Sequence, residues 1–424
     1  MLLLAYGCVL FSNPPPVDSV GDVAPPRVVD TQAEELPEDP ITLVGPTVIL
    51  VSIDGFAQRY WEQADMPALK ALALAGSRAE SLQPVYPSKT FPNHYSQVTG
   101  LYPEHHGIVD NSFEDPISGE DFDFDNKDPY FWLGEPIWIT AERQNLPTAT
   151  MFWPGSEVSF DGDRPRNYVP YDGSIPNRKR VDQVLEWLEL PDGERPRFLT
   201  LYFSDVDHEG HIYGPESASV YRALEEVDES IERLVRGLEE RALLDAVDIL
   251  VVSDHGMEAF SSDKVAYMDD YVDLSTVQIY SWAQHLTLDA ATPDGLPQVM
   301  EQLAGIPNVR CYTREETPAY LHFAESDRIR QAVCLPDEGW VLSTHAYADG
   351  GEKYSSGATH GWDPTYPSMH GIFVAHGPHI QQGYVHPTIE QVQLYNLMAK
   401  ILEVDPAKND GDPLRVADLL RPAP

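Results

Sequence analysis

Three largely apolar segments, each followed closely by acidic side chains, constrain the fold of this chain more than any other feature. They are residues 47–53, 198–203 and 247–253. A mainly apolar run of this length is typical of a strand that is buried on both faces, as in a parallel sheet. Residues 371–375 form a fourth such run, and apolar residues within 216–244 recur at intervals of three and four, which predicts a helix. Strands that alternate with helices indicate an α/β fold with a mostly parallel sheet.

Side chains that can bind metal follow these predicted strands. Asp54 comes directly after the first strand, Asp207 follows the second and Asp254 follows the third. Parallel sheets bind their ligands at the carboxyl ends of their strands, so these carboxylates are expected to lie together. Mixed carboxylate and imidazole ligands suit Zn²⁺ and also Mn²⁺. Three histidines complete a set that is large enough for two metal ions: His211, His255 and His360.

A threonine at the start of a short predicted helix is the candidate nucleophile. Thr90 precedes Phe91 and Pro92, and the helix is expected to end at Gly100. Proline in the first turn and glycine just past the end are typical helix boundaries, so Thr90 is predicted to be the N-cap residue. The free N–H groups of a helix start would face an oxyanion there. The alternative is a plain capping threonine, although a bound metal would activate its otherwise weakly nucleophilic hydroxyl.

The composition restricts the possible partners. Lys and Arg number 28 against 68 Asp and Glu, which gives a net charge of −40. Such a surface repels nucleic-acid polymers and anionic lipid, and the sequence has no basic footprint for DNA or RNA. It also repels phosphate, so a phosphate site needs local cations, which bound metal supplies. Asn111 can donate its amide to a nonbridging phosphate oxygen, or its Asp-Asn pair can simply form a turn.

The first segment of the chain differs from the rest. Residues 1–12 are apolar but too short to span a membrane, and the run that ends at Cys8 resembles a bacterial lipoprotein signal without its positive start. We therefore expect export, to the periplasm or anchored to the envelope through lipid on Cys8; the alternative is a buried hydrophobic tail. Residues 13–45, rich in proline and acids, are predicted to be a disordered tether. Cys311 and Cys334 can pair, but their spacing alone is weak evidence for a disulfide.

Several segments together resemble one known family. Residues 47–111 contain VILVSIDGF and YPSKTFPNHYSQVTGLYPEHHGIVDN, and GEPIW, FWPGS, DVDHEGHIYGP, SDHGM and ATHGWD follow in order. These blocks resemble the nucleotide pyrophosphatase/phosphodiesterase family of the alkaline phosphatase superfamily. The resemblance implies an alkaline-phosphatase-like three-layer α/β fold with a central, mostly parallel sheet. We expect residues 46–420 to form this catalytic domain, with 257–355 as a smaller α+β insertion.

The resemblance also implies a role for each candidate residue. Thr90 would attack phosphorus to form a covalent phospho-threonine intermediate, and Asn111 would grip a nonbridging oxygen. Two zinc ions would be bound, one by Asp54, Thr90, Asp254 and His255, the other by Asp207, His211 and His360. In the nucleotide-cleaving members two aromatic side chains sandwich the base. The matching candidates here are Phe91 and Tyr171, with Tyr202 on the phosphate or leaving-group side; core packing is the alternative for each.

The leading expectation is a two-zinc phosphodiesterase and pyrophosphatase that releases nucleoside 5′-monophosphates from a small nucleotide substrate. One alternative is a choline-phosphate-releasing lysophospholipid or glycerophosphodiester enzyme of the same family, because an acidic aromatic pocket suits a quaternary ammonium group. The other is a non-catalytic metal-binding surface lipoprotein. The sequence assigns no chemistry to residues 257–355 and no oligomeric state.

Overall fold

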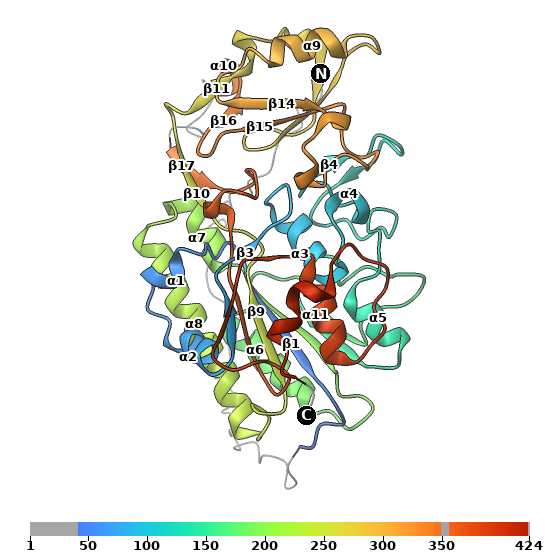
Figure 1. The fold of residues 1–424 in the computed structure, drawn as a ribbon, viewed down its shortest axis with the longest axis vertical. Helices are drawn as coiled ribbons and strands as arrows, with labels where there is room; N and C mark the ends of the chain where they lie inside the picture. Colours follow the sequence, from blue (N-terminus) through green and yellow to red (C-terminus); the bar gives the residue numbers. More distant parts are fainter. Residues whose placement is uncertain (1–40, 349–355, 423–424) are drawn as a thin grey trace, which may run out of the picture. The chain divides into compact units, whose positions relative to one another are not determined.

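A mixed eight-stranded sheet forms the centre of the fold (Figure 1). The computed structural model describes residues 41–348 and 356–422, so the expected signal, Cys8 and most of the tether lie outside the described residues. The order of the strands is β19-β2-β18-β9-β1-β8-β6-β7. Their bounds are β1 (Val48–Ile53), β2 (Ser77–Ala79), β6 (Thr148–Met151), β7 (Asn167–Val169), β8 (Phe198–Phe203), β9 (Asp248–Val252), β18 (Phe373–His376) and β19 (Tyr384–His386).

The direction of the strands follows the expectation in the middle of the sheet. β1 pairs in parallel with β8 and with β9, and β6 pairs in parallel with β8 and with β7. All residues of β1 and β8 are buried, as their largely apolar character predicts. The fourth apolar run, residues 371–375, supplies β18, but this strand runs antiparallel to β9. The predicted strand is therefore present, and its direction was left open because an apolar run does not encode the direction of its strand.

Two hydrophobic clusters cover the two faces of the sheet. Val48 and Leu50 of β1 belong to the cluster formed with helices α3, α5 and α11, whereas Ile49 and Val51 belong to the cluster formed with α2, α6 and α8. This alternation follows from the period of two along a strand, and it produces three layers, helix–sheet–helix. The helices are α1 (Tyr60–Gln63), α2 (Pro67–Ala75), α3 (Thr90–Thr99), α4 (Pro103–His106), α5 (Ile137–Arg143), α6 (Asn177–Leu188), α7 (Asp205–Tyr213), α8 (Ala218–Glu240), α9 (Leu296–Leu303), α10 (His345–Ala348) and α11 (Gln393–Leu402).

The predicted helices are present, with one change at a boundary. The helix expected within 216–244 is α8, and the apolar residues that recur at intervals of three and four are buried: Val220, Leu224, Val227, Ile231, Leu234 and Leu238. The helix expected from Thr90 is α3, which ends at Gly100 in the left-handed conformation. Thr90 is the first helical residue rather than the N-cap, which is Lys89 with extended backbone angles. The N-cap assignment was therefore wrong by one residue, because the helix begins at Thr90 and not, as predicted, at Phe91.

A long insertion leaves and rejoins the main body through a pair of antiparallel strands (Figure 1). These strands are β10 (Glu258–Ser261) and β17 (Ser356–Thr359). Beyond them lies a four-stranded antiparallel sheet with its own hydrophobic cluster, which includes residues of α9. The strands of this sheet, in spatial order, are β12 (Val277–Ile279), β13 (Leu286–Ala290), β15 (Ala332–Pro336) and β14 (Val309–Thr313).

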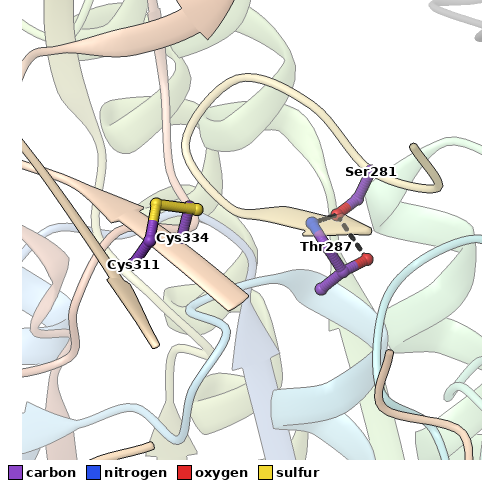
Figure 2. The surroundings of a disulfide bond; sticks show 4 residues. All are labelled: Ser281, Thr287, Cys311 and Cys334. Carbon is purple, nitrogen blue, oxygen red and sulfur yellow. Dashed lines mark hydrogen bonds between the residues drawn. A yellow bond between two sulfur atoms is a disulfide. The ribbon is translucent and has the colours of Figure 1, made fainter. Parts of the chain in front are cut away.

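A disulfide joins Cys311 of β14 to Cys334 of β15, which face each other in the strand register (Figure 2). The cysteine pairing that the spacing left open is thus present in the structure. Three short strand pairs complete the fold: β11 (Val265–Tyr267) with β16 (Val341–Ser343), β3 (Leu82–Gln83) with β20 (Ile389–Glu390), and β4 (Phe113–Glu114) with β5 (Asp121–Phe122). Over residues 41–348 and 356–422, no helix has the length and apolar character needed to cross a membrane.

Candidate active site

Two of the candidate carboxylates emerge together from the carboxyl ends of β1 and β9. Asp54 follows β1 and Asp254 follows β9, and both side chains are buried. The N–H group of Gly55 donates to Asp254 Oδ1 at 3.1 Å, which ties the two loops together. Gly55 has a φ of +68°, and a Cβ atom there would lie 2.8 Å from the Cα atom of Asp207. Glycine is therefore required for all three carboxylates to approach one another.

The third carboxylate and two histidines form the neighbouring group. Asp207 and His211 lie one turn apart on α7, with His211 Nε2 3.4 Å from Asp207 Oδ1. His360 follows β17, and its Nε2 atom lies 3.6 Å from the same oxygen of Asp207. The His211 ring donates from Nδ1 to the carbonyl oxygen of Ala358 in β17, at 3.1 Å. The expected grouping of Asp207, His211 and His360 is present in space.

His255 connects the two groups with the candidate nucleophile. Its Nε2 atom lies 2.9 Å from Asp254 Oδ2, 3.5 Å from Asp54 Oδ1 and 3.3 Å from Thr90 Oγ1. The His255 ring stacks on the ring of His360 with their centroids 3.5 Å apart. His255 precedes β10 and His360 follows β17, so the pairing of these two strands brings the histidines together.

Two residues that the sequence analysis did not single out hold the nucleophile segment. The Asn93 side chain accepts from the Val85 N–H at 2.7 Å and donates to the carbonyl oxygens of Pro87 and Lys89. His94 lies between Ser52 Oγ at 2.8 Å and the carbonyl oxygen of Thr90 at 2.9 Å, so both ring nitrogens are engaged. Their place directly after Thr-Phe-Pro was the only local signal, because side-chain bonds to nearby backbone follow no sequence pattern and the Ser52 partner of His94 lies 42 residues away.

At the start of α3, the backbone N–H of Thr90 itself is available to a bound oxyanion. Asn111 Oδ1 accepts from the Phe91 N–H at 2.8 Å, so that N–H is not available to an oxyanion. The Thr90 N–H and the Asn111 Nδ2 atom make no hydrogen bond within residues 41–348 and 356–422. The expectation that the helix start offers free N–H groups therefore holds for Thr90 but not for Phe91. The bond to Phe91 also orients the Asn111 amide, whose NH₂ group stays available as a donor.

The three candidate aromatic residues differ in their surroundings. Phe91 is partly buried and packs edge-on against Phe124, with ring centroids 5.0 Å apart. Tyr171 is 55% exposed and contacts Phe152 and Tyr202. The Tyr202 hydroxyl donates to Asp54 Oδ2 at 2.5 Å, which makes it a support for a candidate metal ligand. In the described part of the chain the Phe91 and Tyr171 rings do not contact each other, so neither ring covers the face of the other.

The charges of the buried carboxylates depend strongly on one another. Burial, together with repulsion from Asp254 and Asp207, raises the pKa of Asp54 well above its usual range. Burial also disfavours ionised Asp207, but attraction to His211 and His360 outweighs it and lowers the pKa of that carboxyl group. The two carboxyl groups are thus shifted in opposite directions: the site favours the protonated form of Asp54 and the ionised form of Asp207.

The pKa values of the three histidines are also shifted in opposite directions. Burial disfavours the charged form of His255, but attraction to Asp254 outweighs it and raises the pKa of the ring. Attraction to Asp207 likewise overcomes burial at His211 and raises its pKa. Burial lowers the pKa of His360 well below its usual range, and repulsion from His255 adds to the effect. Such opposed shifts within one cluster are typical of functional sites.

The cluster has the properties expected of a divalent metal centre. One oxygen on each of Asp54, Asp207 and Asp254 is buried and makes no hydrogen bond within residues 41–348 and 356–422, although a histidine ring nitrogen lies within 3.5 Å of each. A buried unpaired carboxylate oxygen is costly, and a bound cation would satisfy it. Carboxylate oxygens and imidazole nitrogens are suitable donors for such an ion. Three groups have ligand atoms within 4.8 Å of one another: Asp207 with His211 and His360, Asp54 with His94 and Asp254, and Asp54 with Asp207 and His255.

Comparison with known proteins gives a consistent result. Residues 48–363 match the profile of a family described as type I phosphodiesterase/nucleotide pyrophosphatase. Human ectonucleotide pyrophosphatase/phosphodiesterase family member 1 is 38% identical over 391 residues, which cover 88% of this chain and 42% of that protein. Venom phosphodiesterase CdcPDE of Crotalus durissus collilineatus is 38% identical over 377 residues, 86% of this chain and 45% of that one. The chain spans less than half of the length of these relatives.

Solved structures share the fold. Human ectonucleotide pyrophosphatase/phosphodiesterase 5 superposes with a TM-score of 0.83 at 29% identity, covering 89% of this chain and 100% of that chain. The murine protein 5, solved as an inactive threonine-to-alanine variant in complex with AMP, has a TM-score of 0.83 at 30% identity, with 89% and 100% covered. The expected alkaline-phosphatase-like α/β architecture is thereby confirmed.

Proposed function

The chain belongs to the type I phosphodiesterase/nucleotide pyrophosphatase family, and on this basis we propose that it hydrolyses nucleotide phosphodiester and phosphoanhydride bonds to release nucleoside 5′-monophosphates. The observation that carries this proposal is the position of the Thr90 hydroxyl, 3.3 Å from His255 Nε2 and beside carboxylates with unpaired oxygens. A hydroxyl at a helix start, next to a metal-binding cluster, is suited to attack phosphorus.

We assign two zinc ions to the cluster. Asp54, Thr90, Asp254 and His255 would hold one, and Asp207, His211 and His360 the other. His94 is close enough to join the first group, but its ring nitrogens already bond to Ser52 and to the Thr90 carbonyl oxygen. Because its Nδ1 atom is also 3.4 Å from Asp254 Oδ2, we assign it the role of supporting Asp254 and Thr90. When bound, the ions would supply the positive charge that lowers the pKa of the threonine hydroxyl and of a water molecule and neutralises negative charge on the phosphate.

The chain's own residues then share the steps of the reaction. Thr90 Oγ1 forms a bond to phosphorus, the bond to the alcohol or pyrophosphate breaks, and the product of this step is a phospho-threonine. The Thr90 N–H and the Asn111 NH₂ group donate to the nonbridging oxygens. Water hydrolyses the intermediate in a second displacement, so that configuration at phosphorus is retained overall. The inactivity of a threonine-to-alanine variant of the murine relative supports a threonine nucleophile.

The nucleotide part of the substrate is assigned to the aromatic residues. Phe91 and Tyr171 would contact the base, Phe91 directly next to the nucleophile and Tyr171 with more than half of its surface exposed. The AMP complex of the murine relative supports a nucleoside monophosphate as ligand. A stacked base on an aromatic side chain gains roughly 1–3 kcal/mol, which is enough to orient a small nucleotide.

Hydrolysis by the zinc-loaded protein tests the proposal. Thymidine 5′-monophosphate p-nitrophenyl ester should be cleaved much faster than p-nitrophenyl phosphate and p-nitrophenylphosphorylcholine, and chelator should abolish the activity. A preference for the choline ester would move the function to lipid head groups, and a preference for the monoester would overturn the diesterase assignment. Absence of all three activities at full zinc content would favour a metal-binding protein without catalysis.

A further inference from the structure

The residue before the nucleophile is a lysine whose charge is already neutralised. Lys89 Nζ lies 2.7 Å from Asp110 Oδ1, and the two side chains are only 15% and 7% exposed. The Lys89 stem passes beside Gly361, where a Cβ atom would lie 3.3 Å from Lys89 Cε. The ion pair therefore lies between Thr90, Asn111 and the segment that carries His360.

Asp110 holds more than the lysine. Its Oδ1 atom also accepts from the Asn111 N–H at 2.6 Å, so one oxygen fixes both the cation and the residue that offers its amide to the phosphate. Its Oδ2 atom faces the His285 ring, with Nε2 at 3.8 Å. The carboxylate is thus held through Oδ1 by Lys89 and the Asn111 N–H, with the His285 ring packed near Oδ2, and Lys89 has its counter-ion whether or not substrate is present.

His285 comes from the insertion, in the loop that joins β12 to β13. The loop is closed at its base because Ser281 Oγ accepts from the Thr287 N–H at 2.8 Å and lies 3.0 Å from the Thr287 hydroxyl (Figure 2). The His285 ring is buried, and its Nδ1 atom lies 2.5 Å from the Tyr86 hydroxyl. A neutral ring that accepts the Tyr86 proton at Nδ1 carries its own hydrogen on Nε2, the atom that faces Asp110.

The same loop reaches the metal-ligand segment. Gln284 donates from Nε2 to the Thr359 hydroxyl at 2.8 Å, directly before His360. The insertion, to which the sequence analysis assigned no chemistry, therefore contacts the candidate site through neighbouring residues of a single closed loop.

We propose that Asp110 is a specificity-determining residue: by neutralising Lys89, and held in place by His285, it keeps the phosphate site selective for singly charged diesters over doubly charged monoesters. The inference rests on the proposed function. A phosphodiester carries one negative charge and a phosphomonoester at neutral pH carries nearly two. A free cation beside the phosphate would therefore favour the monoester more than the diester, and the Asp110 carboxylate removes this advantage.

The proposal is tested by comparing four proteins that differ in the charges at residues 89 and 110: the wild type, Asp110→Asn, Lys89→Met and the double variant. The change Asp110→Asn keeps the shape and an acceptor oxygen but leaves Lys89 charged, so the ratio of monoester to diester kcat/KM should rise roughly tenfold or more. Lys89→Met leaves the Asp110 carboxylate without its counter-ion and should lower the ratio of monoester to diester kcat/KM. The double variant is neutral again and should return towards the wild-type ratio. The substrates are p-nitrophenyl phosphate and thymidine 5′-monophosphate p-nitrophenyl ester, with zinc content measured for each protein.

The pattern of the four ratios separates charge from structural damage. Structural damage lowers the monoester and diester activities together. The proposed effect instead raises the monoester-to-diester ratio when a positive charge remains at residue 89 and lowers it when a negative charge remains at residue 110. A matched control is Asp248→Asn, which removes a buried carboxylate that contacts His379 at the opposite end of β9 from Asp254. The control should leave the ratio unchanged. A ratio that stays constant across the four active proteins would overturn the role of Asp110, while an inactive, zinc-loaded wild type would overturn the proposed function on which it rests.

Discussion

At the carboxyl edge of the main sheet, Asp54, Asp207 and Asp254 each keep one buried oxygen that makes no hydrogen bond within the described residues, although a histidine ring nitrogen lies nearby. In the insertion, the buried guanidinium group of Arg328 donates to Asp115 at 3.1 Å and to backbone carbonyl oxygens of Gly107, Phe131 and Tyr130. Both regions bury charge, but the insertion satisfies its charge from within the protein, whereas the sheet edge leaves carboxylates that need a cation.

This difference separates two kinds of role. A region whose buried charges are fully paired contributes to stability and to shape, and removing one partner destabilises it. A region with unpaired buried groups is poised for a ligand, at a cost in stability of the free protein. Changes at the sheet edge should therefore affect metal binding and turnover, and changes within the insertion, away from the loop that carries Gln284 and His285, should mainly affect unfolding.

The largest effect is expected from Thr90→Ala at the sheet edge. Loss of the hydroxyl should lower kcat for the nucleotide diester by roughly a thousandfold or more, because no other group replaces the nucleophile. Zinc content, measured by atomic absorption, should stay close to that of the wild type, since the Asp and His ligands remain. Turnover that survives the substitution would remove Thr90 from the mechanism.

Removal of the disulfide should have its main effect on stability. The double change Cys311→Ala and Cys334→Ala should lower the free energy of unfolding of the insertion by about 2–4 kcal/mol, measured by denaturant titration. At 25 °C the diesterase kcat should change by less than about threefold, because the bond lies in the sheet of the insertion and not at the ligands. As a control, reduced wild-type protein should show the same shift. A large loss of activity without loss of stability would contradict the division between the regions.

Tyr202→Phe tests whether a side chain that bonds to a candidate metal ligand affects zinc binding at the sheet edge. The substitution removes the hydrogen bond that orients Asp54, and zinc affinity should fall by roughly 10- to 100-fold, measured by chelator competition. Tyr95→Phe is the matched control, because the Tyr95 hydroxyl is also buried but has no hydrogen-bond partner in the described structure. Equal effects of the two changes would show that Tyr202 contributes only packing.

The smallest effect expected is a dependence of zinc affinity on pH. The pKa values of His255 and His211 are raised in the metal-free protein, so both rings are more protonated near neutrality than ordinary histidines. Zinc needs them neutral, so its apparent affinity should increase as pH rises through the region above about 6.5 and should level off once both are deprotonated. Calorimetry in two buffers of different ionisation enthalpy should detect proton release on binding. Release should be absent if the rings are already neutral.

Much of the site could be predicted because its residues follow local rules. Asp54, Asp207 and Asp254 were placed by the apolar runs that precede them, and the structure puts His211 one turn after Asp207 on α7. Parallel pairing of β1 with β8 and β9 then brings these segments to one edge. The position of His360 came from the family resemblance, and the structure places it against His255 through the β10–β17 pair.

What could not be predicted depends on distant partners. His94 bonds to Ser52, and His285 approaches Asp110, although neither pair shares a sequence pattern. The antiparallel direction of β18 also escaped prediction, because it is decided by its neighbours in the sheet. The N-cap at Lys89 differs from the expected Thr90 because backbone angles, and not residue type alone, decide where a helix begins.

The β10–β17 pair also constrains the order in which the protein can fold. His255 enters the insertion and His360 leaves it, so the two rings meet only after the whole intervening segment has closed on itself. Contacts between residues so far apart in sequence form late, since the entropy of closing the loop must be met first. A chain that has formed only its central sheet can present Asp54 and Asp254 but not the complete set of ligands. Tight metal binding would therefore report that folding has reached completion.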